Sequence, residues 1–293
     1  MRGHEVWEWA VVARRALLRH VLPAALLIYV GFGALLFFFQ REFIYHPNDQ
    51  AFDACVGLPP GTEVVRYGAH DTRAYYHSGS HASTTLIVLY HGNAGSACDR
   101  AWLARTLFAP AGTAFLLVEY TGYSGDARAP SATAIRANVL DTITFAREHK
   151  SERILVMGQS LGAAAATYHA RSGGADALFL STPFVSYAQL AREHYPIYPT
   201  RYLLRERFDT EHYLTHLKMP ITITHGTDDS LTPPQHARHL ALLTPASTTR
   251  RVEIPEAGHN DIYATTEWFT VAREFIAEHV STTQPVREHR PSP

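Results

Sequence analysis

The chain has 293 residues, of which 46% are hydrophobic and 18% charged, and a formal net charge of −1 at pH 7. This length and composition are typical of one large globular domain with an appendage, and they exclude an extensively disordered chain. The balanced charge, without a run of basic residues, argues against a nucleic acid as partner.

The first predicted element is a membrane-spanning helix. Val21 to Phe39 contain no charged side chain over 19 positions, and as a helix they would span roughly 28 Å, about the thickness of the hydrocarbon core. A cleaved signal peptide is one alternative, but Phe38 to Glu42 include no small side chain at the usual cleavage spacing. A buried core helix is the other, and the apolarity of the segment on all sides argues against it. Residues 1–45 are therefore predicted as a cytoplasmic N-terminus with a transmembrane anchor.

The arginines around this segment predict its orientation. Four precede it and one follows closely: Arg2, Arg14, Arg15, Arg19 and Arg41. By the positive-inside rule, the N-terminus lies in the cytoplasm and the rest of the chain outside it. The many alanines and only two lysines suggest a GC-rich bacterial genome, so the protein is assigned to the inner membrane with its domain in the periplasm. There Cys55 and Cys98 are able to form a disulfide, although two free thiols fit the sequence equally well.

Residues 46–280 are predicted to form the globular domain, and 281–293 a flexible C-terminal tail. A hairpin of Glu63–Tyr67 and Thr72–Tyr76 comes first. Short apolar strands follow at Thr85–Tyr90, Ala114–Glu119, Ile154–Met157, Ala177–Leu180, Ile221–His225 and Arg251–Ile254. Helical stretches alternate with them near Ala97–Phe108, Ser131–His149, Leu161–Arg171, Pro234–Leu243 and Thr265–His279. This alternation predicts an α/β fold with a mainly parallel, eight-stranded sheet covered by helices on both faces.

The pentapeptide Gly158 to Gly162 (GQSLG) lies between a predicted strand and an alanine-rich helix. A G-x-S-x-G pattern in this context is typical of a nucleophile elbow. Ser160 would occupy a strained backbone conformation at the apex, and the two glycines lack the Cβ atoms that would collide there. Its hydroxyl would stand at a helix N-terminus, where negative charge is favoured. Close packing at a helix start is the alternative for the pentapeptide alone, so the interpretation requires partners.

Ligands of such sheets bind at the carboxyl ends of the strands, where two further turns carry candidate residues. In the turn Tyr90 to Gly95, the N–H of Asn93 would complete an oxyanion hole with the N–H of Leu161. A glycine-rich connection without a catalytic role is the alternative. The turn Glu119 to Gly125 is assigned to shaping the pocket.

A carboxylate and a histidine follow Ser160 in the order that this kind of site requires. Asp228 and Asp229 come after one strand, and His259 comes after the next. The histidine can take the Ser160 proton and later return it, while the carboxylate orients the imidazole. Spacing alone does not separate the two adjacent acids. The other histidine pairs have no H-E-x-x-H pattern or third ligand, so no metal site is predicted.

These motifs, in this order, resemble the α/β-hydrolase fold serine hydrolases, in the branch with one N-terminal membrane anchor that includes acyl-protein thioesterases and lysophospholipases. The resemblance covers about residues 40–280 and rests on His91–Gly95, Tyr120–Gly125, Gly158–Gly162, Ser181–Phe184, Tyr195–Pro199, Arg207–Asp209, His225–Asp229 and Gly258–Asp261. The H-G-x-x-D pattern of that branch implies Asp229 as the acid. The chain departs from the branch at Thr121 and Ser124, where relatives often have Arg and Gly. Both departures concern the shape of the pocket rather than the triad.

An insertion of roughly residues 187–218 is too long for an ordinary connection and is predicted to form a small helical cap over the active site. It is rich in aromatic residues and leucines and carries Arg192, Arg201, Arg205 and Arg207. One interpretation is an apolar entrance beside cationic groups, suited to an acyl chain with an anionic head and held near a bilayer by the anchor. A helical pair that only stabilises the fold is the alternative.

The combined prediction is a membrane-anchored serine hydrolase that cleaves ester or thioester bonds of small-molecule or lipid acyl substrates. Ser160 attacks, His259 and Asp229 activate it, and the N–H groups of Asn93 and Leu161 stabilise the oxyanion. The reaction needs no cofactor or metal, and the sequence favours no oligomeric state. A peptidase of the same fold and a catalytically silent membrane-anchored binding protein are the alternatives.

Overall fold

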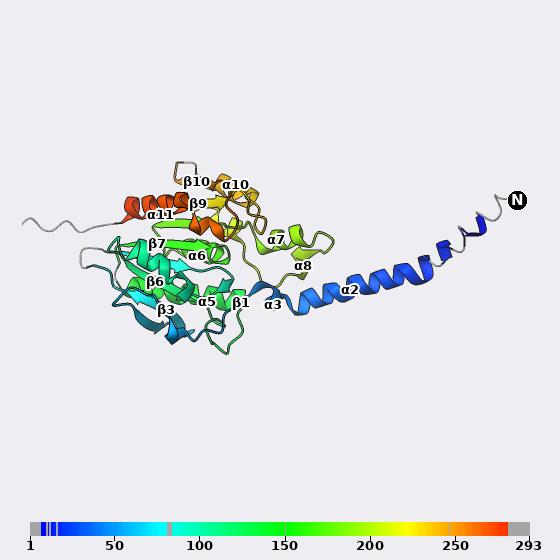
Figure 1. Cartoon of the computed structure of the whole chain (residues 1–293), viewed down its shortest axis with the longest axis horizontal. Helices are drawn as coiled ribbons and strands as arrows, with labels where there is room; N and C mark the ends of the chain where they lie inside the picture. Colours follow the sequence, from blue (N-terminus) through cyan, green and yellow to red (C-terminus); the bar gives the residue numbers. More distant parts are fainter. Residues whose placement is uncertain are drawn as a thin grey trace, which may run out of the picture.

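The computed structural model describes residues 7–280, apart from 10, 12, 16, 81–83, 150 and 246. A long N-terminal helix extends away from one end of an α/β domain (Figure 1). The tail predicted for residues 281–293 and the first six residues of the chain lie outside the described part.

The centre of the domain is a sheet of eight strands in the order β10-β9-β8-β7-β4-β6-β3-β2. The strands are β2 (Glu63–Tyr67), β3 (Thr72–His77), β4 (Thr85–Tyr90), β6 (Ala114–Glu119), β7 (Arg153–Gln159), β8 (Ala177–Ser181), β9 (Ile221–Gly226) and β10 (Thr249–Ile254). Neighbours from β6 to β10 pair in parallel, whereas β2 and β3 form the antiparallel hairpin. The predicted mainly parallel sheet is confirmed.

Helices cover both faces of the sheet, and the inner strands β4, β6 and β8 are buried at every position. Val88 and Val156 pack on one face against α5 (Ala132–Glu148), α6 (Leu161–Arg171) and α10 (Gln235–Leu242). Leu89 and Met157 pack on the other against α11 (Thr266–His279) and the segment 98–108. Ser131 and Thr265 cap the starts of α5 and α11 by accepting hydrogen bonds from backbone N–H groups.

The helix predicted near Ala97–Phe108 is less regular than expected. A 3-10 turn (Cys98–Arg100), α4 (Ala101–Leu103) and a π-helical turn (Ala104–Phe108) follow one another. Cys98, at its start, forms a disulfide with Cys55, whose Cα atom is 5.6 Å away. Of the two states that the sequence left open for the cysteines, the structure has the disulfide.

The insertion predicted as a cap contains α7 (Tyr187–His194), α8 (Thr200–Leu203) and α9 (Thr210–Leu214). Ser186 caps α7 through the N–H of Gln189. Helices α7 and α8 lie at the end of the domain that meets the N-terminal helix (Figure 1).

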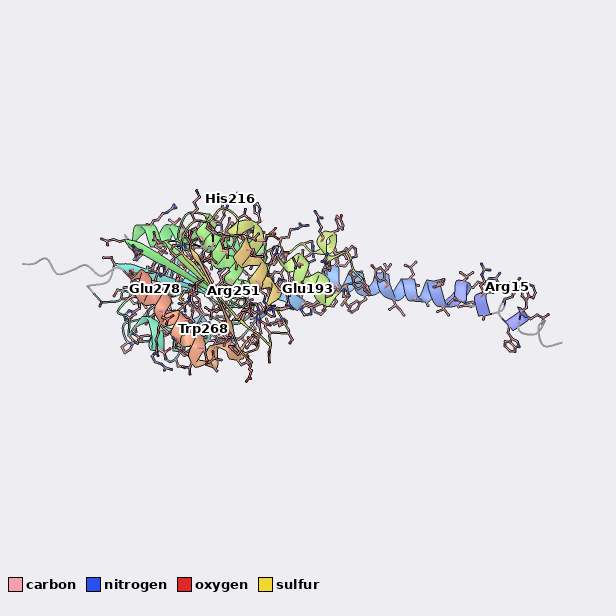
Figure 2. The ribbon with its side chains drawn as sticks, turned by 90° about the horizontal axis from the view of Figure 1, so that it is seen from above. Arg15, Glu193, His216, Arg251, Trp268 and Glu278 are labelled. Atoms are coloured by element: carbon pink, nitrogen blue, oxygen red, sulfur yellow. A yellow bond between two sulfur atoms is a disulfide. The ribbon has the colours of Figure 1, made fainter. Side chains whose placement is uncertain are left out.

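The N-terminal helix consists of a π-helical turn (Leu17–Val21), α2 (Leu22–Phe38) and α3 (Gln40–Ile44). Within the described residues, Trp7–Phe38 is the one helix long and apolar enough to cross a membrane, and only 6% of its most apolar window is buried. That exposure distinguishes it from a core helix. Arg15 lies at the end of the helix remote from the domain (Figure 2).

Candidate active site

Ser160 stands between the end of β7 and the start of α6, with φ 51° and ψ −113°. This left-handed conformation costs roughly 1–3 kcal/mol for a residue with a side chain. The surrounding fold holds it there: the Ser160 N–H donates to the Ser181 carbonyl over 2.9 Å. The next N–H, that of Leu161, is the first of α6 and therefore lacks an acceptor within its helix.

The two glycines of the pentapeptide are required by close backbone approach. A Cβ atom on Gly158 would overlap the Gly162 carbonyl, and one on Gly162 would overlap the carbonyl of Tyr90 at the end of β4. The strand and the helix can therefore meet at Ser160 only if both positions lack a side chain.

Asp229 and His259 form a hydrogen-bonded pair after β9 and β10. The Nδ1 atom of His259 lies 2.8 Å from Oδ2 of Asp229. The other carboxylate oxygen, Oδ1, accepts the N–H groups of Leu231 (3.0 Å) and Thr232 (2.7 Å). Asp228 is exposed and accepts from the hydroxyl of its neighbour Thr227. The structure therefore places Asp229, and not Asp228, against His259.

A second histidine, which the sequence reasoning gave no role, also contacts this carboxylate. Nε2 of the buried His225 lies 3.2 Å from Oδ2 of Asp229 and 2.6 Å from the Thr232 carbonyl. Burial by itself would raise the pKa of Asp229, but the hydrogen bonds of His225 and His259 and the N–H of Thr232 hold it well below its usual range. The only signal for His225 was its place at the head of the H-G-x-x-D pattern.

The loop after β4 carries Asn93 next to the elbow. A Cβ atom on Gly92 would lie 3.9 Å from that of Ser160, so the two turns are in contact. The Asn93 carbonyl accepts from the His46 N–H (2.9 Å) and the Tyr123 hydroxyl (2.7 Å), and its side chain donates to the Ile44 carbonyl (2.8 Å). Strands β1 (His46–Pro47) and β5 (Ala94–Gly95) pair in parallel beside it. The Asn93 loop is therefore joined directly to the chain that leaves the N-terminal helix.

A buried hydrogen-bonded pair, His91 and Glu119, supports this loop on the side of β6. Nε2 of His91 lies 2.9 Å from Glu119, and Nδ1 lies 2.8 Å from the Gly92 carbonyl. Glu119 also accepts the Ser124 hydroxyl (2.6 Å) and the Ala97 N–H (3.1 Å). Burial would raise the pKa of Glu119, but the hydrogen bond and charge of His91, with these two donors, lower it. The sequence analysis did not foresee this pair.

The sequence assigns the turn Glu119 to Gly125 to shaping the pocket. Its tyrosines bind the Asn93 loop: the Tyr120 hydroxyl donates to the His91 carbonyl over 2.7 Å, and the Tyr123 hydroxyl donates to the Asn93 carbonyl. None of its residues is among those that line the cavity. This turn therefore acts on the site through the loop.

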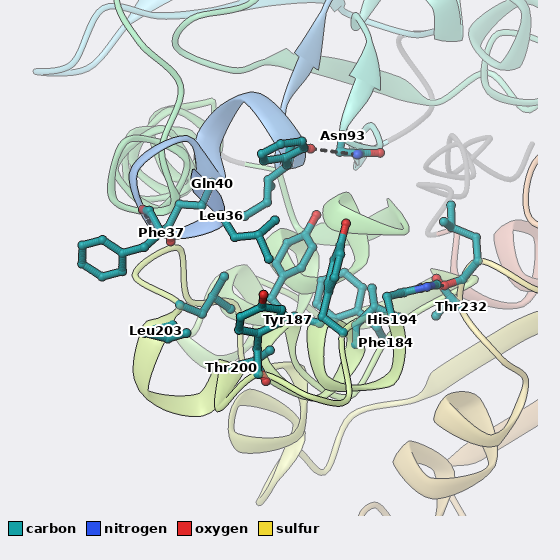
Figure 3. A pocket seen from close by; sticks show the side chains of 18 of the residues that line it. Leu36, Phe37, Gln40, Asn93, Phe184, Tyr187, His194, Thr200, Leu203 and Thr232 are labelled. Carbon is teal, nitrogen blue, oxygen red and sulfur yellow. Dashed lines mark hydrogen bonds between the residues drawn. The ribbon is translucent and has the colours of Figure 1, made fainter. Parts of the chain in front are cut away.

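A cavity of about 470 Å³ opens at Ser160. Its lining is mainly apolar and comes from four places: the N-terminal helix (Leu36, Phe37, Gln40, Phe43, Ile44), the cap (Phe184 to Leu204), the elbow with Asn93, and Leu231 with Thr232. Figure 3 shows Leu36 and Gln40 on one side of it and His194 and Thr232 on another. Leu231 and Thr232, whose N–H groups donate to Asp229, line the same cavity as Ser160.

No protein-family model matches the chain. Uncharacterized protein Rv2307c of Mycobacterium tuberculosis is 30% identical over 246 residues, which cover 81% of this chain and 87% of that protein. Protein bem46 of Schizosaccharomyces pombe is 24% identical, with 71% and 72% covered. Uncharacterized membrane protein YNL320W of Saccharomyces cerevisiae is also 24% identical, with 67% and 72% covered.

Two solved structures with the same fold are esterases. Esterase Pf2001 of Pyrococcus furiosus superposes with a TM-score of 0.63 at 14% identity, covering 81% of this chain and 99% of the esterase. Thermogutta terrifontis esterase 2, phosphonylated by sarin, gives a TM-score of 0.59 at 19% identity, with 75% and 95% covered. The chain therefore has the α/β-hydrolase fold and belongs to one family with protein Rv2307c of Mycobacterium tuberculosis.

Proposed function

We propose that the protein is a membrane-anchored serine hydrolase that cleaves carboxylic ester or thioester bonds. The observation that carries this proposal is the position of Ser160 on a strained strand-to-helix turn, in an apolar cavity also lined by Leu231 and Thr232, whose N–H groups bind Asp229. Asp229 in turn contacts His259. A buried, ionised carboxylate beside one imidazole nitrogen is the arrangement that prepares the other to accept a proton.

In the proposed reaction, His259 takes the proton of the Ser160 hydroxyl as the oxygen attacks the substrate carbonyl. The N–H groups of Leu161 and Asn93 donate to the oxyanion of the tetrahedral intermediate. His259 then returns the proton to the leaving group, whose bond to the acyl carbon breaks. A water molecule, deprotonated by His259, then attacks the acyl-enzyme; the bond from the acyl carbon to Ser160 breaks, and His259 returns the proton to the Ser160 oxygen. Asp229 holds the imidazole in one orientation throughout.

The cavity favours an acyl substrate over a polypeptide. It is enclosed by the cap and the N-terminal helix, and its lining is largely leucine and aromatic side chains. A polypeptide would need partners for its backbone polar groups along such a surface, whereas a hydrocarbon chain does not. A fatty acyl ester or thioester is therefore the proposed substrate class, and peptidase action is the less favoured alternative.

The location follows from the N-terminal helix and the disulfide. The exposed apolar helix, with its arginines at the remote end, serves as a single-pass anchor with a cytoplasmic N-terminus. The disulfide between Cys55 and Cys98 is typical of an oxidising compartment, which supports a periplasmic domain. Within this proposal residues 1–45 form the anchor, 46–280 the hydrolase domain and 187–218 its cap.

The first test is labelling of the detergent-solubilised protein with a fluorophosphonate probe, with Ser160→Ala alongside. We expect labelling of the wild type and none of the variant, and hydrolysis of p-nitrophenyl butyrate to follow the same pattern. A folded wild type that neither reacts with the probe nor cleaves the ester would favour a silent binding protein. Cleavage of peptides but not of esters would favour the peptidase.

A further inference from the structure

The N-terminal helix forms a wall of the cavity that contains Ser160. Five of the lining residues, Leu36, Phe37, Gln40, Phe43 and Ile44, belong to the last turns of α2 and to α3. In Figure 3 Leu36 lies on the helix side of the cavity, across from Tyr187 and Phe184 of the cap side. A helix that served only as a tether would not need to line the cavity.

The cap contacts the membrane-spanning part of this helix. The ring of Tyr198 stacks on that of Tyr29 with centroids 4.6 Å apart. The Tyr198 hydroxyl donates to the Tyr29 carbonyl (3.0 Å), and the Tyr29 hydroxyl donates to the Ile197 carbonyl (2.9 Å). Tyr29 precedes the end of α2 at Phe38 by roughly 14 Å along the helix axis. If the helix spans the bilayer, the cap segment Tyr195–Thr200 must enter the membrane beside it.

The composition of this cap segment suits a hydrocarbon environment. Tyr195 to Thr200 contain no charged side chain, and Ile197 is 69% exposed. Tyr202 is 78% exposed, and Phe43 also has an exposed ring on the helix side. In water these side chains would form an unfavourable apolar surface, but in lipid they are compatible with their surroundings.

The junction between helix and cap is held by buried polar contacts. The Gln40 side-chain oxygen accepts the N–H groups of Arg205 (2.7 Å) and Glu206 (3.2 Å). Glu206 accepts from Arg41 (2.7 Å) and from the Tyr45 hydroxyl (2.8 Å). These contacts join residues about 165 positions apart and fix the position of the N-terminal helix relative to the cap.

We infer that the acyl chain of the substrate reaches Ser160 sideways from the bilayer, along a channel between the membrane anchor and the cap. The substrate class is then an ester or thioester whose long, single acyl chain already lies in the leaflet next to the domain. This inference rests on the proposed hydrolase function, and it adds that the anchor is part of the acyl-binding site. A lipid and an acylated peptide share this chemistry.

The test compares Leu36→Trp with Leu35→Trp in the full chain, reconstituted in lipid nanodiscs. Leu36 lines the cavity, whereas its neighbour Leu35 is 43% exposed and does not. The kcat/KM is measured for a p-nitrophenyl ester of a long acyl chain and for one of a short chain. We expect the ratio of long-chain to short-chain kcat/KM to fall at least tenfold in Leu36→Trp and to change less than twofold in Leu35→Trp. Equal ratios in the two variants would overturn the inference.

Substrate presentation tests the sideways route itself. A fluorogenic long-chain lysophospholipid and a long-chain acylated peptide are each placed either in the same nanodisc as the enzyme or in separate vesicles. For the preferred substrate, we expect the initial rate of turnover to be at least tenfold higher from the shared nanodisc than from separate vesicles. Comparison of the lysophospholipid with the acylated peptide then shows which of the two carries the acyl chain. Equal rates from both arrangements, at concentrations where transfer is slow, would contradict entry from the bilayer.

Labelling separates failure of this inference from failure of the proposed function. A short-chain fluorophosphonate should label the wild type and both tryptophan variants, which shows a folded, reactive Ser160. A long-chain fluorophosphonate should label Leu36→Trp at least tenfold more slowly than Leu35→Trp. Absence of all labelling would contradict the hydrolase function, whereas equal labelling of both variants by the long probe would contradict only the role of the anchor.

Discussion

Asp229 binds two histidines through one oxygen: Oδ2 lies 2.8 Å from Nδ1 of His259 and 3.2 Å from Nε2 of His225. Its other oxygen accepts two backbone N–H groups, so every side of the carboxylate is satisfied. A carboxylate held in this way has one available rotamer. The fixed carboxylate of Asp229 therefore also fixes the orientation of the His259 imidazole.

The first prediction contrasts the adjacent acids. Asp229→Asn should lower kcat for a short ester by about 10³- to 10⁴-fold, because an amide would favour the wrong tautomer of His259. Asp228→Asn is the matched control, since Asp228 is exposed and bonds only locally, and it should change kcat less than twofold. Steady-state hydrolysis of p-nitrophenyl butyrate measures both. Similar losses in the two variants would contradict the proposed role of Asp229.

The second prediction concerns Ser124, which has φ 46° and donates to Glu119 over 2.6 Å. Ser124→Ala removes the hydrogen bond and keeps the unfavourable φ, so it should destabilise the protein by about 1–3 kcal/mol. Ser124→Gly also removes the bond but adopts this φ without strain, which should recover up to about 1 kcal/mol. In thermal unfolding in detergent, the wild type should have the highest midpoint temperature, Ser124→Gly an intermediate one and Ser124→Ala the lowest. An alanine variant at least as stable as the glycine variant would refute this explanation.

The third prediction concerns pH and the buried His169, which lies 2.8 Å from the Tyr90 hydroxyl and 2.7 Å from the Gly174 carbonyl. Burial lowers its pKa to about 4, compared with about 6.5 in an unfolded chain. Between these values the unfolded state binds more protons, so the contribution of His169 is complete above about pH 6.5 and is lost as the pH falls toward 4. This loss amounts to roughly 3 kcal/mol.

The variant His169→Gln tests whether protonation of His169 lowers the stability of the protein at acidic pH. Its free energy of unfolding should fall less than that of the wild type when the pH is lowered from 7 to 4.5, measured by denaturant titration at each pH. His239→Gln is the control, because the His239 side chain is largely exposed. A variant at position 169 with the full wild-type pH dependence would assign the effect to other groups.

The fourth prediction uses two glycines of the N-terminal helix. A Cβ atom on Gly33 would lie 2.9 Å from the Tyr198 ring, whereas one on Gly31 would meet nothing within 4 Å. Gly33→Leu should therefore separate the cap from the helix, and Gly31→Leu should not. Trypsin cleavage after the exposed Arg201 in detergent should become faster only in Gly33→Leu. Equal cleavage rates would show that the cap does not depend on this contact.

The sheet and its helices could be predicted because their signals are local. Apolar runs such as Thr85–Tyr90 and the pattern Gly158–Gly162 mark strands and turns without knowledge of distant residues. The segment 98–108 is more irregular than predicted, and its first residue, Cys98, is bonded to Cys55 in a disulfide that helix propensity does not take into account. The roles given to the proposed catalytic residues stay predictions.

The surroundings of the site were harder to predict because they depend on contacts between distant residues. Spacing cannot tell which of two adjacent acids points inward, and only the fold turns Asp229 toward His259. The pair His91 and Glu119, 28 positions apart along the chain, joins the ends of two neighbouring strands, β4 and β6. The contact between Tyr29 and Tyr198 joins residues 169 positions apart, so no local sequence pattern around either residue indicates it.

The pairing of β1 with β5 has a practical consequence for production of the protein. The chain that leaves the N-terminal helix forms hydrogen bonds with the Asn93 loop at once, through Ile44 and His46. A fragment that starts after this helix would lack a wall of the cavity and part of the support of that loop. Weak activity of such a fragment would result from removal of the helix. Assays should therefore use the intact chain, purified in lipid or detergent.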